Sequence, residues 1–220
     1  MISYINMLKY SFFFWSYFIF IGSTYCYSVN NKPVVVPQKI MLLYNLVNSL
    51  INFYIVVNLF PYVFNKNLGV EKPHDNIVQN MIYLHYMTKY LDFFDTFFMI
   101  LRHKWKQVHF LQLFHHSTIG LVWYYALNDA PKISATISFG AFINSIIHTI
   151  MYLHYFITAL KFKNPYKKYL TRLQMIQFVV CIYHAYYVQT KFIEYRLFSI
   201  LQITYMLIMI SLFYIYVYMK

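Results

Sequence analysis

The chain has 220 residues, of which 60% are hydrophobic and 23% aromatic, and its mean hydropathy is +0.47. Only 11% of the residues are charged, against about 25% in an average soluble domain. A soluble fold could not hide this much apolar surface, so the composition excludes a soluble protein and predicts an integral membrane protein with a single domain, residues 1–220. The net charge of +12 then belongs to basic loops and anionic ligands, and no nucleic-acid partner is expected.

Seven stretches reach the roughly 20 mostly apolar residues that a membrane-spanning helix needs. The first follows Lys9 and is longer than the apolar core of a signal peptide, so we expect it to be retained as a helix. The chain is therefore predicted to be an all-α bundle of seven transmembrane helices joined by short polar segments. The predicted spans are 8–28, 41–64, 81–101, 108–127, 134–160, 173–190 and 198–218.

Loop charge predicts the orientation of these spans. One set of loops carries eleven Lys and Arg residues and the other carries six, so the positive-inside rule places the first set in the cytosol. The N-terminus is then lumenal and the C-terminus cytosolic. The cytosolic set is Lys32, Lys39, Arg102, Lys104, Lys106, Lys161, Lys163, Lys167, Lys168, Arg172 and Lys220, and the lumenal set is Lys9, Lys66, Lys72, Lys132, Lys191 and Arg196.

The third span contains charged side chains, which are costly in hydrocarbon and therefore indicate a functional site. Lys89, Asp92 and Asp95 follow one another at spacings of three and share one helix face with Thr96. An ion pair between Lys89 and one carboxylate would have a purely structural role. That pair does not account for the second carboxylate, which needs a hydrogen bond or a proton.

The next three spans also carry polar stripes. In the fourth, Gln112 lies one turn before His115 and His116, so the three side chains can face one cavity. A single buried histidine is more often a core residue than a catalyst. Several histidines with amide neighbours on adjacent membrane helices instead indicate a shared polar site. The fifth span carries Asn144, His148, Tyr152 and Tyr155, and the sixth carries Gln174, Gln177, Cys181 and His184.

Three classes of membrane protein fit these residues to different degrees. A di-iron oxygenase needs several histidine boxes, whereas this chain has one adjacent pair, and Cys26 and Cys181 form no CxxC metal motif. A seven-helix carrier or receptor also fits, although helix-breaking Gly and Pro are scarce in the spans. Acyl transfer needs a nucleophile, a base and an oxyanion donor, and imidazole can be the first two. Acyl transfer uses the residues best, and a heptahelical lipid or solute carrier is the alternative.

Ordered motifs extend from the second span to the sixth. They are Leu43-Tyr44-Asn45; Lys89-x-x-Asp92-x-x-Asp95-Thr96; Leu101-Arg102; Gln107-Val108-x-Phe110-Leu111 leading to His115-His116; Asn144-Ser145-x-x-His148-x-x-Met151-Tyr152-x-x-Tyr155; and Lys167-Lys168-Tyr169-Leu170-Thr171-x-x-Gln174-x-x-Gln177-Phe178. Each motif alone is weak. Together and in register, they resemble the fatty-acid elongase (ELO) family of membrane 3-ketoacyl-CoA synthases.

The chain departs from the pattern of that family at three positions. Asp92 stands where Glu is usual, Gln112 replaces the first histidine of an HxxHH box, and His154 stands where tyrosine is usual. Some elongases resemble this chain in carrying glutamine at the position of Gln112. The replacement is therefore expected to alter acyl preference rather than to remove activity.

The resemblance implies seven helices around a narrow substrate tunnel, in the membrane of the endoplasmic reticulum. The implied reaction condenses a long-chain acyl-CoA with malonyl-CoA and yields a 3-ketoacyl-CoA two carbons longer, CO2 and CoA. It implies no metal and no organic cofactor. The implied partners are the two CoA thioesters, membrane lipid, further copies of the chain and the other enzymes of the elongation cycle.

Roles for the polar residues follow from this reaction. His115 is expected to accept the acyl group, because a neutral imidazole can attack a thioester. His148 would be its partner in the condensation, with Asn144 or a tyrosine hydroxyl as an oxyanion donor. The other expected site residues are His116 and Asp95, which would orient or tune the imidazoles, and Tyr152, Lys89, Asp92, Gln112 and His184, which would line the site.

The predicted loop Lys161–Arg172 is the most basic of the cytosolic loops. Its Lys167, Lys168 and Arg172 are expected to bind the phosphates of CoA, since guanidinium and ammonium groups both pair with phosphate. Ordinary positive-inside charge explains the same residues equally well. The two explanations are compatible, and both stay open.

The predicted topology can be tested with single cysteines in a background that lacks Cys26 and Cys181. Cysteines placed in the loops Arg102–Gln107 and Lys161–Arg172 should react with a membrane-impermeant reagent from the same, cytosolic side. A cysteine in the loop Lys191–Leu197 should react only after the membrane is permeabilised. Labelling of the first two loops from opposite sides would contradict the seven-span model.

Overall fold

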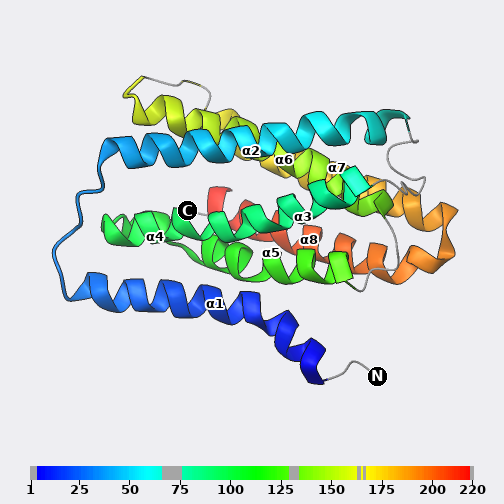
Figure 1. Cartoon of the computed structure of the whole chain (residues 1–220), viewed down its shortest axis with the longest axis horizontal. Helices are drawn as coiled ribbons and strands as arrows, with labels where there is room; N and C mark the ends of the chain where they lie inside the picture. Colours follow the sequence, from blue (N-terminus) through cyan, green and yellow to red (C-terminus); the bar gives the residue numbers. More distant parts are fainter. Residues whose placement is uncertain (1–3, 66–75, 129–133, 163–164, 166, 219–220) are drawn as a thin grey trace. The chain divides into compact units, whose positions relative to one another are not determined.

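A computed structural model describes residues 4–65, 76–128, 134–162, 165 and 167–218. Within these ranges every regular element is helical, in agreement with the predicted all-α class (Figure 1). The α-helices are α1 (Tyr4–Val29), α2 (Gln38–Asn65), α3 (Asn76–Leu91), α4 (Phe93–Leu101), α5 (Phe110–Asn128), α6 (Ser134–Ala159), α7 (Lys167–Lys191) and α8 (Arg196–Tyr218), and the short 3-10 helices are η1 (Trp105–Gln107) and η2 (Ile193–Tyr195).

Three helices of the described chain are long and apolar enough to cross a membrane: α2, α6 from Ile137, and α8 as far as Val217. Helices α3 and α4 have 16 and 9 residues, which is short for a span by itself. Helices α1, α5 and α7 are long enough, with 26, 19 and 25 residues, but none of them is among the three described helices that are also apolar enough. The chain is thus a helical membrane protein, and the count of seven spans stays a prediction.

The third predicted span is wrong in one respect, because the structure divides it into two helices at Asp92. The N–H of Asp92 still donates to the carbonyl of Thr88, at 3.0 Å. The N–H of Asp95 instead donates to the carbonyl of Asp92, at 3.2 Å, which is the tighter i to i−3 spacing of a 3-10 turn. The helix is therefore interrupted at a charged residue of the predicted site.

The chain forms two compact units. The first comprises Met1–Pro37 and Tyr86–Asp129, and the second comprises Gln38–His85 and Ala130–Lys220. The predicted site residues are divided between them. Those of the third and fourth predicted spans belong to the first unit, and those of the fifth and sixth belong to the second.

In the first unit, α1 packs against α4 and α5 through an aromatic core (Figure 1). The buried ring of Phe13 meets Tyr90 and Phe93 edge-on, with centroids 4.6 and 4.8 Å away. The same ring lies directly against Gly120 of α5, where a Cβ would overlap it. Gly120 therefore permits the close approach of α1 and α5, as small residues do between membrane helices.

The chain after α1 is fastened to the end of α4. Ser28 donates from its hydroxyl to the carbonyl of Ile100 at 2.9 Å, and the N–H of Val34 donates to the carbonyl of Leu101 at 2.8 Å. His103, in the left-handed region with φ 53°, places its Nε2 3.0 Å from the carbonyl oxygen of Ser28. These bonds fix the backbone that carries the exposed residues Arg102, Lys104 and Lys106.

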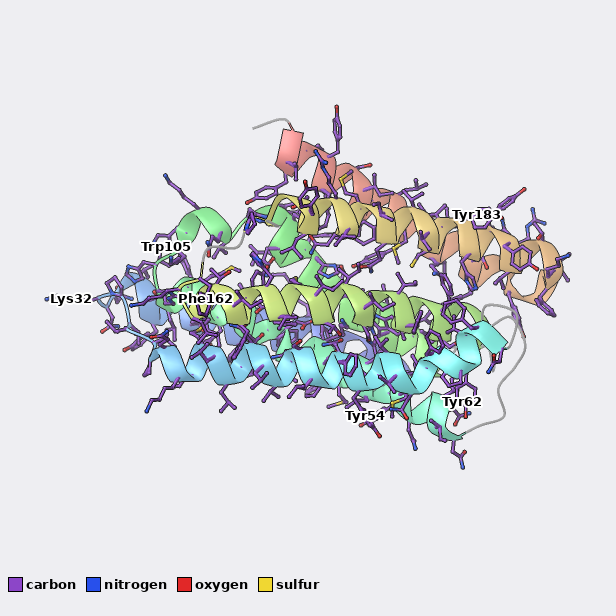
Figure 2. The ribbon with its side chains drawn as sticks, turned by 90° about the horizontal axis from the view of Figure 1, so that it is seen from above. Lys32, Tyr54, Tyr62, Trp105, Phe162 and Tyr183 are labelled. Atoms are coloured by element: carbon purple, nitrogen blue, oxygen red, sulfur yellow. The ribbon has the colours of Figure 1, made fainter. Side chains whose placement is uncertain are left out.

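In the second unit, α2 packs along α6, α6 against α7, and α7 against α8 (Figure 1). The buried face of α2 is polar in its first half and apolar in its second. Ser49 in the polar half donates from its hydroxyl to the carbonyl of Thr149 on α6, at 3.1 Å. Figure 2 shows Tyr54 of α2 and Tyr183 of α7 pointing away from the ribbon, and both are exposed. The buried residues of α2 are Asn45, Asn48, Ser49, Asn52, Ile55, Leu59 and Val63.

The close approach at Gly120 predicts a steric effect on stability. Gly120→Ala would place a methyl group where the Phe13 ring lies, and such overpacking typically costs about 1–3 kcal/mol. Gly22→Ala is a matched control, because a Cβ there meets no described atom within 4 Å. Since alanine is the better helix former by up to about 1 kcal/mol, that variant should be neutral or slightly stabilised.

Thermal unfolding of both variants in detergent checks this prediction. The melting temperature should fall for Gly120→Ala only, and shortening the neighbour with Phe13→Leu should recover part of the loss. Equal melting temperatures for the two alanine variants would show that the Phe13 ring moves aside without a loss of stability.

Candidate active site

The first unit contains the predicted pair of charges. Lys89 at the end of α3 is 1% exposed, and its Nζ lies 3.4 Å from Oδ2 of the buried Asp92. Isolated charges in an apolar interior are very costly, and an opposite charge at this distance offsets part of that cost. The pair therefore keeps both side chains inside the unit.

The second carboxylate, Asp95, is half-buried one turn along α4. It interacts electrostatically with Lys89 and with the Tyr17 side chain of α1. Tyr17 is fully buried, and its hydroxyl lies 3.2 Å from Oγ1 of Thr96. The tyrosine thus adds a hydroxyl from α1 to the stripe predicted for the third span.

Helix α5 supplies the amide and imidazole groups. Nε2 of Gln112 lies 2.9 Å from Nε2 of the buried His116. In this orientation the amide nitrogen is the donor and His116 accepts, so a neutral His116 carries its proton on Nδ1. The sequence predicted a hydrogen bond from Gln112 to a neighbouring imidazole, and the structure assigns it to His116 rather than to His115.

His116 links α5 to the charged stripe within the first unit. It interacts electrostatically with both Asp92 and Lys89, and the rings of His116 and Tyr17 have centroids 6.2 Å apart. His115 is half-buried, and its ring centroid lies 5.6 Å from that of His116 at an interplanar angle of 72°. The planes of the two neighbouring imidazoles are therefore steeply inclined to each other.

The second unit holds another polar cluster around α6. His148 is buried, and its ring centroid lies 5.8 Å from that of the fully buried Tyr152. The hydroxyls of Tyr152 and Tyr44 of α2 are 3.4 Å apart. Asn144 is half-buried one turn before His148. The predicted stripe on α6 is therefore correct as far as Tyr152, but the next predicted member, Tyr155, is 39% exposed.

Helix α7 contributes its predicted stripe to the same unit. Gln177, Cys181 and His184 are all buried, and Nε2 of Gln174 donates to the sulfur of Met151 at 3.7 Å. The ring of His184 stacks on Phe139 of α6, with centroids 3.8 Å apart and an interplanar angle of 6°. An apolar stack of this kind fixes the orientation of the imidazole plane.

The residues expected to meet CoA lie on a helix rather than in a loop. The structure begins α7 at Lys167, so Lys167, Lys168 and Arg172 belong to its first turns, and the predicted loop Lys161–Arg172 is too long. The side chains of Lys167 and Lys168 lie outside the described residues. Arg172 is exposed, with its guanidinium carbon 5.8 Å from the ring centroid of Tyr169.

Two further residues of the polar clusters, His85 and Tyr17, were not predicted from the sequence. His85 on α3 is fully buried, with Nδ1 2.9 Å from the hydroxyl oxygen of Ser145 on α6. Its position four residues before Lys89 extends the charged stripe and could have identified it. Tyr17 gave no such signal, because it is one of 25 tyrosines in the chain.

The structure brings together two sets of predicted residues, one in each unit. A single site that includes both His115 and His148 stays a prediction. Among the described residues, no group of three or more His, Cys, Asp or Glu side chains is placed to hold a metal ion. Metal-independent chemistry likewise stays a prediction.

The buried Lys89–Asp92 pair predicts that removal of one of its charges greatly lowers the free energy of unfolding. Lys89→Met leaves Asp92 buried without its counter-charge, which typically costs about 3–5 kcal/mol. Lys89→Met combined with Asp92→Leu leaves no charge and should cost much less. Unfolding of the single and double variants in detergent measures this difference. A double variant as unstable as the sum of the two singles would show that the pair is not coupled.

Comparison with known proteins places the chain among relatives of one kind. It is 41% identical over 161 residues to fatty acid elongase 5 of Leishmania major, covering 71% of this chain and 63% of the relative. It is 37% identical over 177 residues to fatty acid elongase 5 of Trypanosoma cruzi, covering 80% of this chain and 70% of the relative. Very long chain fatty acid elongase 2 of Mus musculus is 32% identical over 177 residues, covering 76% and 59%. The chain thus spans about two thirds of the length of these curated relatives.

The family comparison covers the whole chain. The model described as the ELO, or GNS1/SUR4, family matches residues 1–220. The motifs that resemble this family lie within this match and are divided between the two units. The resemblance drawn from those motifs is confirmed, and the chain belongs to the ELO (GNS1/SUR4) family.

Proposed function

We propose that the chain is a fatty-acid elongase that condenses an acyl-CoA with malonyl-CoA to a 3-ketoacyl-CoA, CO2 and CoA. Relatives that match most of this chain are named fatty acid elongases, which supports the proposal. The observation that carries it is the hydrogen bond between Gln112 and His116 beside His115, on a helix that also faces the buried Lys89–Asp92 pair. Such a polar group inside an apolar bundle is costly and is typical of a site that performs chemistry.

The first half-reaction transfers the acyl group to His115. The imidazole attacks the thioester carbonyl, a carbon–nitrogen bond forms, and the carbon–sulfur bond breaks. The proton of the imidazole goes to the departing sulfur, so that CoA leaves as the free thiol. Because Gln112 occupies Nε2 of His116, His116 is less suited to attack and better suited to position its neighbour.

The charged residues of the first unit divide into two roles in this proposal. Lys89 neutralises Asp92, which leaves Asp95 as the carboxylate that can orient or tune an imidazole. Its interactions with Tyr17 and Lys89 keep Asp95 within the polar stripe. Thr96 and Tyr17 complete this stripe through their shared hydrogen bond.

The second half-reaction forms the new carbon–carbon bond. Malonyl-CoA loses CO2, and the resulting enolate attacks the acyl-imidazole carbonyl while the carbon–nitrogen bond breaks. His115 returns as neutral imidazole after taking up one proton. The enolate oxygen needs hydrogen-bond donors, and His148, Asn144 and the hydroxyl of Tyr152 are the candidates on α6, with His184 of α7 lining the same site.

The remaining parts of the proposal concern the surroundings of the reaction. The helices would enclose a substrate tunnel in the membrane of the endoplasmic reticulum, with the N-terminus lumenal and the C-terminus cytosolic. Arg172, Lys167 and Lys168 would meet the CoA phosphates. The reaction would use no metal or organic cofactor, because imidazole supplies the nucleophile and the proton transfers. Copies of the chain and other enzymes of the elongation cycle are the proposed protein partners.

The proposal is tested with labelled malonyl-CoA and a panel of acyl-CoAs, using membranes that contain the protein and membranes that lack it. Incorporation of label into a longer acyl chain is the expected result. Binding of acyl-CoA without incorporation would favour the alternative, a lipid or solute carrier in which the same polar residues bind rather than react.

Covalent catalysis predicts a burst in the first half-reaction. Incubation with acyl-CoA alone should release CoA once per active site before malonyl-CoA is added. His115→Ala should abolish this burst, since loss of a nucleophile costs on the order of a million-fold in a comparable acyl-transfer enzyme. His148→Ala should retain some burst while blocking condensation, and His154→Asn, on another buried histidine of α6, is a control that should keep both steps.

One outcome would replace the acyl-imidazole with another mechanism. If folded His115→Ala still released CoA from acyl-CoA at a near-normal rate, His115 would not be the acyl acceptor. Direct attack of the malonyl-derived enolate on the bound thioester would then explain condensation better.

The hydrogen bond of Gln112 to His116 predicts that substitution of Gln112 changes the selectivity for acyl chains. Gln112→His replaces the amide that bonds His116 with another hydrogen-bonding group of similar reach, so activity should remain and the preferred acyl chains should change. Gln112→Leu removes the bond altogether and should lower activity with every acyl-CoA. Product profiles across the acyl-CoA panel measure both effects. A correctly folded but inactive Gln112→His variant would contradict a permissive role for this position.

A further inference from the structure

A hollow lies at the turn between α7 and α8, within the second unit. None of its residues takes part in the proposed condensation. It lies at the opposite end of α7 from Arg172, which is proposed to bind the CoA phosphates. The lining residues are Gln189, Thr190, Lys191, Ile193, Arg196 and Ile200.

The polar groups of this hollow suit a phosphate. Lys191 and Arg196 are both exposed, and an ammonium together with a guanidinium fork provides charge-assisted donors for phosphate oxygens. Gln189 adds an amide, whereas the hydroxyl of Thr190 already donates to the carbonyl of Tyr187 at 2.7 Å. Residues 189–200 include one acidic residue, Glu194, so the segment keeps a net positive charge.

The backbone that carries these cations is held by an aromatic core. Val188 and Tyr195 are buried, and Tyr187 and Phe192 pack against them. The N–H of Phe192 donates to the carbonyl of Val188 at 3.0 Å, and the N–H of Tyr195 donates to that of Phe192 at 3.1 Å. The ammonium of Lys191 also lies 5.7 Å from the ring centroid of Tyr187. The turn therefore presents its two cations from an ordered frame.

The position of the hollow along α8 indicates where the phosphate comes from. The apolar span of α8 starts at Arg196 and has 22 residues, which at 1.5 Å per residue measures roughly 33 Å, close to the thickness of the hydrocarbon core. Only 6% of its apolar window is buried inside the protein, which suits a helix that faces lipid. Arg196 then lies at the boundary where phospholipid phosphates are found.

The side chains at the rim of the hollow indicate that the ligand is a lipid rather than a soluble anion. Ile193, Leu197 and Ile200 are all exposed beside the two cations. Exposed aliphatic side chains next to a phosphate site fit the glycerol and acyl portions of a lipid, and they offer nothing to a free anion. We infer that this hollow binds the phosphate of an anionic glycerophospholipid in the leaflet at the α7–α8 turn, separately from the acyl-CoA site.

The inference is tested on the full chain purified in detergent, with phosphatidylserine as the probe. Wild-type protein should be stabilised against heat by phosphatidylserine and should retain about one molecule of it in native mass spectrometry. Lys191→Gln combined with Arg196→Gln should weaken this binding at least about tenfold, since two charge-assisted contacts are lost. Lys32→Gln combined with Lys39→Gln removes two exposed cations elsewhere, one of which, Lys32, extends from the ribbon in Figure 2, and should leave binding unchanged.

Three results would overturn the lipid assignment. Equal weakening by both double variants would indicate attraction to basic surface in general. Equal binding of phosphatidylcholine would show that the lipid charge does not matter. Displacement of phosphatidylserine by millimolar inorganic phosphate would indicate a site for a soluble anion. Arg196→Lys keeps the charge but loses the guanidinium fork, so we expect its affinity for phosphatidylserine to be intermediate. An intermediate affinity would show that the weaker binding of the double variant comes from lost contacts and not from misfolding.

Discussion

The organisation of this chain depends on one constraint, that charged and polar side chains inside an apolar bundle must find partners within the protein. Water is excluded from the hydrocarbon region, so an unpaired polar group there is costly. The first unit answers this constraint with the Lys89–Asp92 pair and the Gln112–His116 hydrogen bond. The second answers it with the Tyr44–Tyr152 and His85–Ser145 contacts. In each unit, residues that satisfy the constraint lie beside a histidine that is proposed to take part in the reaction, His115 next to His116 and His148 next to Tyr152.

Helix α1 shows how packing and polarity are combined. Its Phe13 fits against Gly120 of α5, which brings the backbones of α1 and α5 close together. One turn later along α1, Tyr17 places its hydroxyl against Thr96 of α4 and its ring near His116 of α5. Gly120 has no chemical role of its own, but the close packing that it permits helps to position the side chains around Tyr17 and His116. A change in the packing of α1 should for this reason be felt by the imidazoles of α5.

Much of the fold and part of the site could be predicted from the sequence, because hydropathy and helical spacing are local properties. Apolar runs located the helices, and spacings of three and four found the Lys89–Asp92 pair and the reach of Gln112. The interruption at Asp92 could not be predicted, because a change from i−4 to i−3 bonding leaves the pattern of side chains almost unaltered. The contact between His85 and Ser145 joins residues 60 apart in sequence, which requires the packing of α3 against α6 to be known. The start of α7 at Lys167 could not be predicted, because basic residues occur both in cytosolic loops and in the first turns of helices.

The central claim is that the half-buried imidazole of His115, beside the Gln112–His116 pair, carries the acyl group. Peptide mass spectrometry of rapidly quenched protein, after incubation with acyl-CoA alone, tests this claim most directly. The account predicts one acyl group on the peptide from α5, located at His115, which disappears when malonyl-CoA is added. Formation of elongated product with no acyl group on the protein at any time, or with an acyl group on Cys181 in place of His115, would contradict it.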